Sequence, residues 1–347
     1  LRGDITIIEA FKVGRLYLTL LFTFVVYDEV FYSGSAKWIK KVIISIALYY
    51  TLIVILNVLL PSFINRIFVG GGNIVKENAW GLENTTRYVI KGNPGILFIH
   101  LGFTITFFDY FSKYSRDKTI PYILSVLLLG MVFQGWRAPL IVLTSICVFV
   151  YSIKEKVDKL IKMILTMLLL LFLLFILEEL SQNDFLTGKL VSAYNEVIGE
   201  STGSLEGRIN RALVYQIPMF KESMWFGYGF VHKNSEFAEV LGNTGERPYN
   251  LYDFDFGYIT LLNSFGIFGT FIFVGGLILI TLKIYRFIKR NSELLWLQVA
   301  LVITITFIVI NFSFGALVSQ IGLVPLSLAL GTAQWELLNF KNANGKY

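Results

Sequence analysis

The chain has 347 residues, of which 55% are hydrophobic and 16% are charged, whereas an average soluble domain has roughly 25% charged residues. Several apolar runs approach or exceed the roughly 17–25 residues that cross a hydrocarbon core, and they lack the alternation of barrel strands. This composition excludes an ordinary soluble enzyme. It predicts an all-α protein, a polytopic transmembrane helical bundle with one long extracytoplasmic helical loop.

The basic residues are unevenly distributed along the chain. Of 30 Lys and Arg, 16 lie in five short connectors, whereas three segments more than twice as long together hold 11. Basic residues gather in the cytoplasmic connectors of membrane proteins, so the net charge of +6 indicates topology and not a nucleic-acid partner. The five connectors that we expect to be cytoplasmic are 33–41, 112–118, 154–162, 283–292 and 337–347.

We expect residues 1–347 to form a single integral membrane domain with about nine spans. Because the sequence begins at Leu1 without a methionine, we expect further N-terminal spans to be missing from it. Alternating the spans places the N-terminus outside, where Arg2, Lys12 and Arg15 fit the charge rule less well. The predicted spans are 13–32, 42–60, 94–111, 119–134, 138–153, 163–179, 255–282, 293–311 and 314–336.

Three segments are predicted to face outward. Residues 61–93 form a Gly- and Asn-rich loop, residues 135–138 form a tight hairpin, and residues 180–254 form the long loop that we expect to be catalytic. Within it, Ser204 to Ser223 is predicted to be helical, because Ser204 suits the N-cap position. Pro218 is expected to bend or end this helix.

The sequence offers little that could hold a metal or a nucleotide. The single Cys147 excludes a multi-cysteine metal site, and the two histidines lie far apart in the sequence. No P-loop, HExxH or GxGxxG pattern is present, which disfavours a nucleotide-driven pump. We therefore expect no metal and no cofactor.

Arg137 is the sharpest candidate for a functional side chain. The hairpin arms around it have about 16 residues, or roughly 24 Å of helix, so Arg137 is expected slightly below the outer surface. An arginine at such a depth costs up to about 3 kcal/mol, and it usually lines a polar cavity. The alternative is that Arg137 reaches the headgroups while Trp136 anchors the interface.

Arg208 and Arg211 lie in the long loop, two spans away from Arg137 and hence on the same side of the membrane. Arg208, Arg211 and Tyr215 share one helical face by spacing. Guanidinium groups match phosphate oxygens in a bidentate manner and stay charged, so three of them suit a diphosphate. The alternative is a solvated or headgroup-facing helix surface.

Other candidates lie near the end of the long loop. Asp253 and Asp255 precede the 255–282 span, where a carboxylate can cap the helix or act as a general base. Trp225 and Tyr228 could stack on sugar faces. The alternative is that they only lie at the membrane–water interface, where Trp and Tyr are generally enriched.

The order of these motifs resembles the O-antigen polymerase and ligase superfamily. An arginine ends a span at Arg137, Gly207-Arg208 lies in the long loop, Trp225-Phe226-Gly227-Tyr228-Gly229 follows, and a re-entering element runs from Asp255 to Gly269. The resemblance covers about residues 94 to 312. It rests on the order and the common side of several short motifs.

The resemblance implies a bacterial inner-membrane glycosyltransferase that needs neither metal nor nucleotide. Such enzymes transfer oligosaccharides from undecaprenyl diphosphate on the extracytoplasmic face. Arg137 and Arg208 would engage the diphosphate or adjoining sugars. A flippase and a chain-length regulator are the expected protein partners, beside membrane lipids. The product would be lipopolysaccharide O-antigen, capsule or exopolysaccharide.

Two alternatives remain open. In the ligase branch the element after the loop begins with a His-Asn pair, whereas Asp255-Phe256 stands here, which favours a repeat-unit polymerase over a ligase acting on another acceptor. The second alternative is a transporter for a lipid-linked or anionic solute. A transporter would often show two similar halves, and the sequence shows none.

Overall fold

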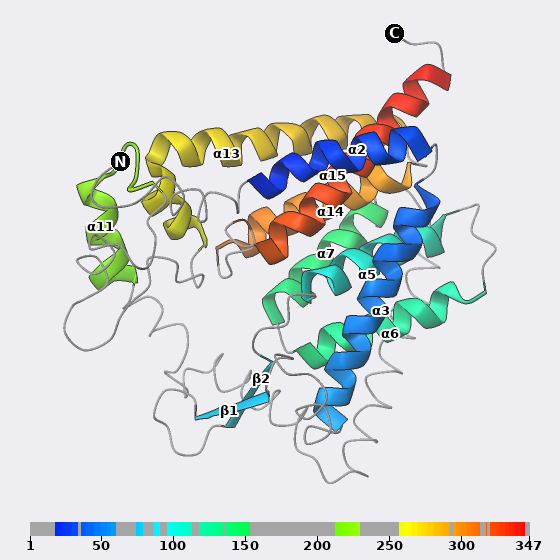
Figure 1. Cartoon of the computed structure of the whole chain (residues 1–347), viewed down its shortest axis with the longest axis horizontal. Helices are drawn as coiled ribbons and strands as arrows, with labels where there is room; N and C mark the ends of the chain where they lie inside the picture. Colours follow the sequence, from blue (N-terminus) through cyan, green and yellow to red (C-terminus); the bar gives the residue numbers. More distant parts are fainter. Residues whose placement is uncertain are drawn as a thin grey trace. The chain divides into compact units, whose positions relative to one another are not determined.

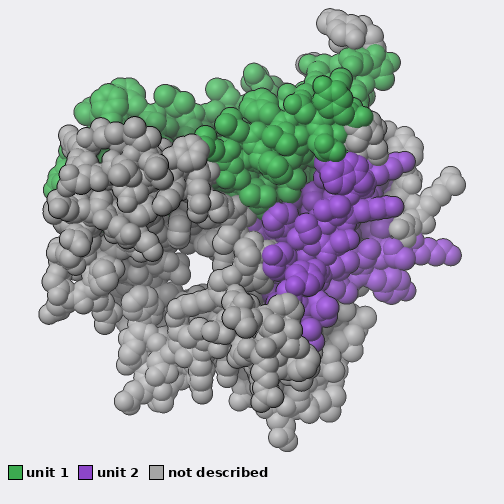
Figure 2. All heavy atoms as spheres, in the orientation of Figure 1, with its two compact units in different colours: residues 1–36, 208–347 green, residues 37–207 purple. Residues whose placement is uncertain are grey.

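The structure is a computed structural model of the whole chain, shown in Figure 1. It describes residues 18–33, 36–59, 74–78, 86–90, 96–112, 118–134, 137–152, 212–229, 257–291, 294–312, 317 and 320–343. Helices dominate these residues, which confirms the helical prediction. The chain divides into two compact units, unit 1 with residues 1–36 and 208–347 and unit 2 with residues 37–207 (Figure 2).

In the part of unit 2 that the structure describes there are four long helices and one hairpin. Small residues let its helices approach closely. A Cβ on Gly102 would lie 2.5 Å from the Cβ of Ala47, and a Cβ on Gly130 would lie 2.6 Å from the hydroxyl of Thr51. Small residues at such contacts are typical of packed membrane helices. The helices are α3 (Lys37–Leu59), α5 (Ile96–Phe111), α6 (Ile120–Gln134) and α7 (Arg137–Ser152).

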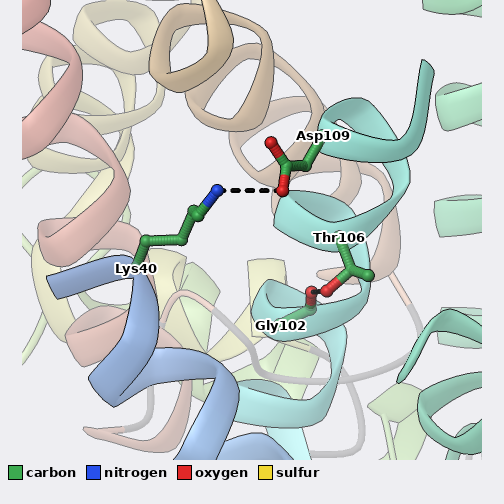
Figure 3. Close-up of polar contacts among 4 residues, drawn as sticks. All are labelled: Lys40, Gly102, Thr106 and Asp109. Atoms are coloured by element: carbon green, nitrogen blue, oxygen red, sulfur yellow. Dashed lines mark hydrogen bonds and ion pairs between the residues drawn. The ribbon is translucent and has the colours of Figure 1, made fainter. Parts of the chain in front are cut away.

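Polar groups also tie α3 to α5. The Lys40 ammonium lies 2.8 Å from Oδ2 of Asp109, and both side chains are partly exposed (Figure 3). Within α5, the Thr106 hydroxyl donates to the Gly102 carbonyl at 2.8 Å. This bond satisfies a hydroxyl that would otherwise be costly in an apolar interior.

A hairpin stands where the sequence predicts only a Gly- and Asn-rich loop. Strands β1 (Ile74–Asn78) and β2 (Thr86–Ile90) pair antiparallel, with Ile74 opposite Ile90 and Asn78 opposite Thr86. The prediction of an all-α protein is therefore incomplete, because the protein also contains these two paired strands. Each strand has only five residues, too few for a clear alternation of polar and apolar side chains to stand out in the sequence.

The described residues of unit 1 include three long helices, α13 (Gly257–Arg290), α14 (Leu295–Ile310) and α15 (Gln320–Ala343). The first turn η1 (Thr19–Leu21) and α2 (Phe22–Ser33) pack on α15. A Cβ on Gly331 would lie 2.5 Å from the Thr23 carbonyl oxygen, and the Ser327 hydroxyl donates to the Thr19 carbonyl at 3.0 Å. These contacts bring η1 and the first turn of α2 close to α15.

Two of the described helices are long and apolar enough to cross a membrane, within Lys37–Leu56 and Gly257–Lys289. Only 11% of the apolar window in Gly257–Lys289 is buried, unlike the core helix of a soluble protein. Four shorter apolar helices accompany them, at Leu97–Phe111, Ile120–Val132, Pro139–Tyr151 and Leu295–Ile310. The count of nine spans stays a prediction, because residues 163–179 lie outside the described residues.

Candidate functional site

Most of the predicted site residues lie outside the described part of the structure. Arg208, Arg211, Asp253 and Asp255 fall outside it altogether. Arg137 is the first residue of α7 and Tyr215 belongs to a helical turn, but the structure describes only their backbones. The roles of all these side chains stay predictions. Trp225 and Tyr228 are described, and they belong to the best-defined polar arrangement in unit 1.

This arrangement begins with two short helical segments. The π-helical turn η3 (Ala212–Gln216) leads into α11 (Ile217–Glu222), which ends at Ser223. Pro218 lies in the first turn of α11, where a missing N–H breaks no helical bond. The helix therefore does not end at Pro218. It changes from π to α form beside it and continues to Glu222.

After α11 the chain makes a closed turn. The Gly227 N–H donates to the Ser223 carbonyl at 2.8 Å, and the Ser223 hydroxyl donates back to the Gly227 carbonyl at 2.7 Å. Gly227 has φ of 68° and Gly229 has φ of 74°. Glycine adopts such left-handed conformations without a steric penalty, so this turn explains both glycines of the Trp-Phe-Gly-Tyr-Gly motif.

Helix α13 is broken at Gly266, whose φ is 65° and ψ is −172°. A break of this kind leaves carbonyl groups unpaired at the end of the first half and N–H groups unpaired at the start of the second. In an apolar environment such groups must find partners inside the protein.

The turn after α11 supplies those partners. We call the paired segments, Met224–Gly229 and Asn263–Phe268, the interlock. Two N–H groups of the turn donate to carbonyls of the first half of α13, and two N–H groups of the second half donate to carbonyls of the turn. The four bonds are Tyr228 N–H to Asn263 O at 2.8 Å, Gly229 N–H to Ser264 O at 2.9 Å, Ile267 N–H to Met224 O at 2.9 Å and Phe268 N–H to Trp225 O at 3.2 Å.

Two glycines make this close approach possible. A Cβ on Gly227 would lie 2.5 Å from the backbone nitrogen of Gly266. A Cβ on Gly266 would overlap with the carbonyl group of Trp225. The turn and the broken helix therefore meet backbone to backbone, without room for a side chain at either position.

Tyr228 connects the interlock back to α11. Its hydroxyl lies 2.8 Å from the Met219 carbonyl oxygen and 2.9 Å from Oε2 of Glu222, so it can donate to either. The hydroxyl is thus used within the protein. The predicted stacking of its ring on a sugar stays a prediction.

Three aromatic rings gather on the outside of the interlock, and we call them the ring cluster. The Phe268 ring lies 5.5 Å from that of Trp225 and 5.6 Å from that of Phe226, measured between centroids. The exposed fractions are 55% for Trp225, 77% for Phe226 and 51% for Phe268. Sequence reasoning named Trp225 but missed Phe268, whose only signal was its place in the re-entering element.

Two buried amides accompany the interlock. Asn263 is 1% exposed and Gln216 is 9% exposed. Neither the Asn263 Oδ1 nor the Gln216 Oε1 atom has a hydrogen-bond partner among the residues that the structure describes. A buried acceptor without a donor is costly, so each is suited to receive a hydrogen bond from water or from a hydroxyl-bearing substrate.

Comparison with known proteins agrees with the motif order. Residues 120–274 match a family described as O-antigen ligase. The match runs from the start of α6 into the second half of α13, so it includes the whole interlock. No curated protein and no solved structure matches the chain significantly. The resemblance that the motifs predict is confirmed.

Proposed function

We propose that the chain polymerises lipid-linked oligosaccharide repeat units into a surface polysaccharide. The match of residues 120–274 to a family described as O-antigen ligase supports this proposal. The protein is an integral membrane protein, and the family implies a glycosyl-transferring or ligase activity. The finer proposal is an undecaprenyl-diphosphate donor, used at the extracytoplasmic face of a bacterial inner membrane. A flippase would deliver this donor, and a chain-length regulator would act on the growing polymer.

The interlock is the observation that carries this proposal. It joins the Trp-Phe-Gly-Tyr-Gly turn to the re-entering element, two motifs that are separate in the sequence and lie in one matched region. Arg211 directly precedes η3, and Asp255 lies two residues before α13. The chain therefore enters η3 next to Arg211, a predicted phosphate-binding residue, and enters α13 next to Asp255, a predicted general base.

These residue types suit transfer from a diphosphate. In the proposed step the acceptor hydroxyl oxygen forms a bond to the anomeric carbon, and the bond from that carbon to the diphosphate oxygen breaks. The diphosphate leaves with the electron pair, and fixed guanidinium groups stabilise its charge. Asp255 is the proposed acceptor of the hydroxyl proton. The donor is already activated, so the step needs no nucleotide.

A ligase is the second candidate, because the matched family is described by that activity. The polymerase is preferred because Asp255-Phe256 stands where the resembled ligases carry a His-Asn pair. The two activities differ in the acceptor. A polymerase joins the transferred glycan to another lipid-linked repeat, whereas a ligase joins it to lipid A or a protein. Identifying the group at the reducing end of the product separates them.

The arginines provide the test. We expect Arg208→Ala or Arg137→Ala to abolish long polysaccharide chains in cells, because each removes a cation that stabilises the leaving diphosphate. The matched control is Lys221→Ala, which removes an exposed cation from the same predicted loop and should leave chain length unchanged. Polysaccharide length is read on gels at equal protein levels. Wild-type chains in both arginine variants would exclude the proposed mechanism.

A further inference from the structure

Two buried amides on neighbouring elements of unit 1 lack hydrogen-bond donors. Gln216 is the last residue of η3, and Asn263 lies in the first half of α13, against which η3 packs. Their oxygens, Gln216 Oε1 and Asn263 Oδ1, are buried and have no hydrogen-bond partner among the residues that the structure describes. An unpaired buried acceptor costs free energy in folding. These two atoms are therefore suited to a partner that arrives from outside the chain.

The backbone at Gln216 is also irregular. η3 is a π-helical turn, and the chain changes to α form at Ile217. Such turns are rare, and they occur frequently at functional sites. Arg211, a predicted phosphate-binding residue, directly precedes this turn. The irregular turn and the unpaired amide are independent observations at one place, and both lie within residues 120–274, the region that matches the family.

We propose that Gln216 and Asn263 bind a hydrogen-bond-donating group of the lipid-linked oligosaccharide, either a sugar hydroxyl or the N–H of an acylated amino sugar. The inference rests on the function proposed above and assigns two residues that select the saccharide. Both amides are buried in the substrate-free chain, so binding requires η3 to move on α13. This movement can leave the interlock intact, because η3 makes none of its four bonds.

The chemistry of the unpaired atoms indicates which part of the substrate they meet. An amide oxygen accepts hydrogen bonds and donates none. The ionised diphosphate of the proposed donor offers acceptor oxygens alone, so it would repel Oε1 and Oδ1 instead of pairing with them. The polyprenyl chain carries no polar hydrogen. Within such a donor only the saccharide supplies hydroxyl or N–H groups.

A permanently buried water is the alternative partner. Such a water typically makes about three hydrogen bonds and forms part of the folded structure. Removing one of its amide partners would lower stability and leave substrate binding unchanged. A saccharide partner gives the opposite pattern, because it is absent when the free protein unfolds. An apolar side chain of similar size then removes an unpaired acceptor and should keep or raise stability.

Asn263→Leu and Gln216→Met make this replacement with side chains of similar size. Purified full-length protein in nanodiscs is assayed with the native lipid-linked repeat unit, extracted from cells that lack the protein. We expect each variant to lower kcat/KM about two- to tenfold, the range for one hydrogen bond between neutral groups. Without substrate, each variant should unfold at or above the wild-type temperature.

Asn311→Leu is the matched control. Asn311 is also a fully buried amide, but it lies at the C-cap of α14 and its Oδ1 accepts the Leu317 N–H at 3.0 Å. It also lies outside the matched residues. Asn311→Leu should lower the unfolding temperature, because it leaves the Leu317 N–H unpaired. The kcat/KM of the folded protein should stay at the wild-type value.

The possible outcomes are distinct. If wild-type protein is active and Asn263→Leu and Gln216→Met keep its kcat/KM, the saccharide site is wrong while the proposed function stands. Lower unfolding temperatures in these two variants, as in Asn311→Leu, would also overturn the site, since the amides would then stabilise the free fold. If wild-type protein forms no polymer from the native repeat unit, the proposed function itself fails.

Discussion

At the scale of single residues, Gly266 meets two constraints that favour glycine. Its φ of 65° suits glycine, and the Trp225 carbonyl group occupies the space where a Cβ would lie. Gly275 and Gly276 of α13 meet neither constraint. Gly275 is helical and has open space beside it. Comparing substitutions at Gly266 and Gly275 therefore distinguishes loss of the interlock from the general effect of changing a glycine in a membrane helix.

We expect Gly266→Ala to abolish polymer formation and to lower stability by on the order of 1–3 kcal/mol, because the new methyl group forces the turn away from the broken helix. Gly275→Ala should retain activity and change stability by less than about 1 kcal/mol. Thermal unfolding in detergent and polysaccharide length measure the two effects. Full activity in Gly266→Ala would show that the interlock is dispensable.

A second pair of glycines distinguishes conformation from close contact. Gly227 and Gly229 both have positive φ, but only at Gly227 would a Cβ meet the backbone of α13. Alanine at Gly227 should therefore be the more damaging of the two, and the difference between the variants isolates the steric part.

At the scale of elements, the helices of unit 2 depend mainly on packing. Gly102 and Gly130 bring α3 close to α5 and α6, and buried Phe107 contacts Phe103, Phe108 and Phe111 around it. The Lys40–Asp109 ion pair adds a polar link between α3 and α5, but 28% and 19% of the two side chains are exposed. A pair of this kind contributes little because water and salt screen it.

The ion pair gives a quantitative prediction. A double-mutant cycle with Lys40→Met and Asp109→Asn should yield a coupling energy of about 0.2–1 kcal/mol that decreases as salt rises. Unfolding of the purified protein at low and high ionic strength measures it. A coupling energy well above this range that does not change with salt would show that the ion pair is shielded from water in the membrane-embedded protein. Side-chain packing would then contribute less to the stability of unit 2 than we infer.

At the scale of the whole molecule, topology depends on which end of α13 faces outward. The 22 residues from Phe268 to Lys289 span roughly 33 Å of helix, close to the thickness of a hydrocarbon core. The ring cluster and the 283–292 connector should then lie near opposite surfaces of the membrane. The charge asymmetry of the sequence predicts that the connector is the cytoplasmic one.

Cysteine labelling tests this orientation. Native Cys147 is fully buried, so background reaction should be low. In intact cells an impermeant thiol reagent should label Phe226→Cys and spare Lys289→Cys, and both should react after the membrane is opened. The reverse pattern would place the interlock on the cytoplasmic side and would contradict the extracytoplasmic site.

The sequence by itself determined that the chain is helical and rich in membrane-length apolar segments, because these properties follow from local composition and from the length of apolar runs. Motif order also sufficed to predict a resemblance to the O-antigen polymerase and ligase superfamily, which the family match over residues 120–274 supports. The short hairpin and the change from π to α form before Pro218 could not be predicted from the sequence, since strand pairing and the type of helical turn leave only a weak trace in the side-chain pattern.

Only the tertiary structure decided how the motifs meet. The Trp-Phe-Gly-Tyr-Gly turn reads in sequence as a loop with aromatic residues, and Gly266 reads as an ordinary glycine in an apolar run. Their connection consists of backbone hydrogen bonds between distant segments, and every residue except proline carries the same N–H and C=O groups. The need for glycine at Gly227 and Gly266 becomes apparent only when the two backbones are seen in contact. The same contact brings Phe268 next to Trp225, so the structure and not the sequence added Phe268 to the candidate site.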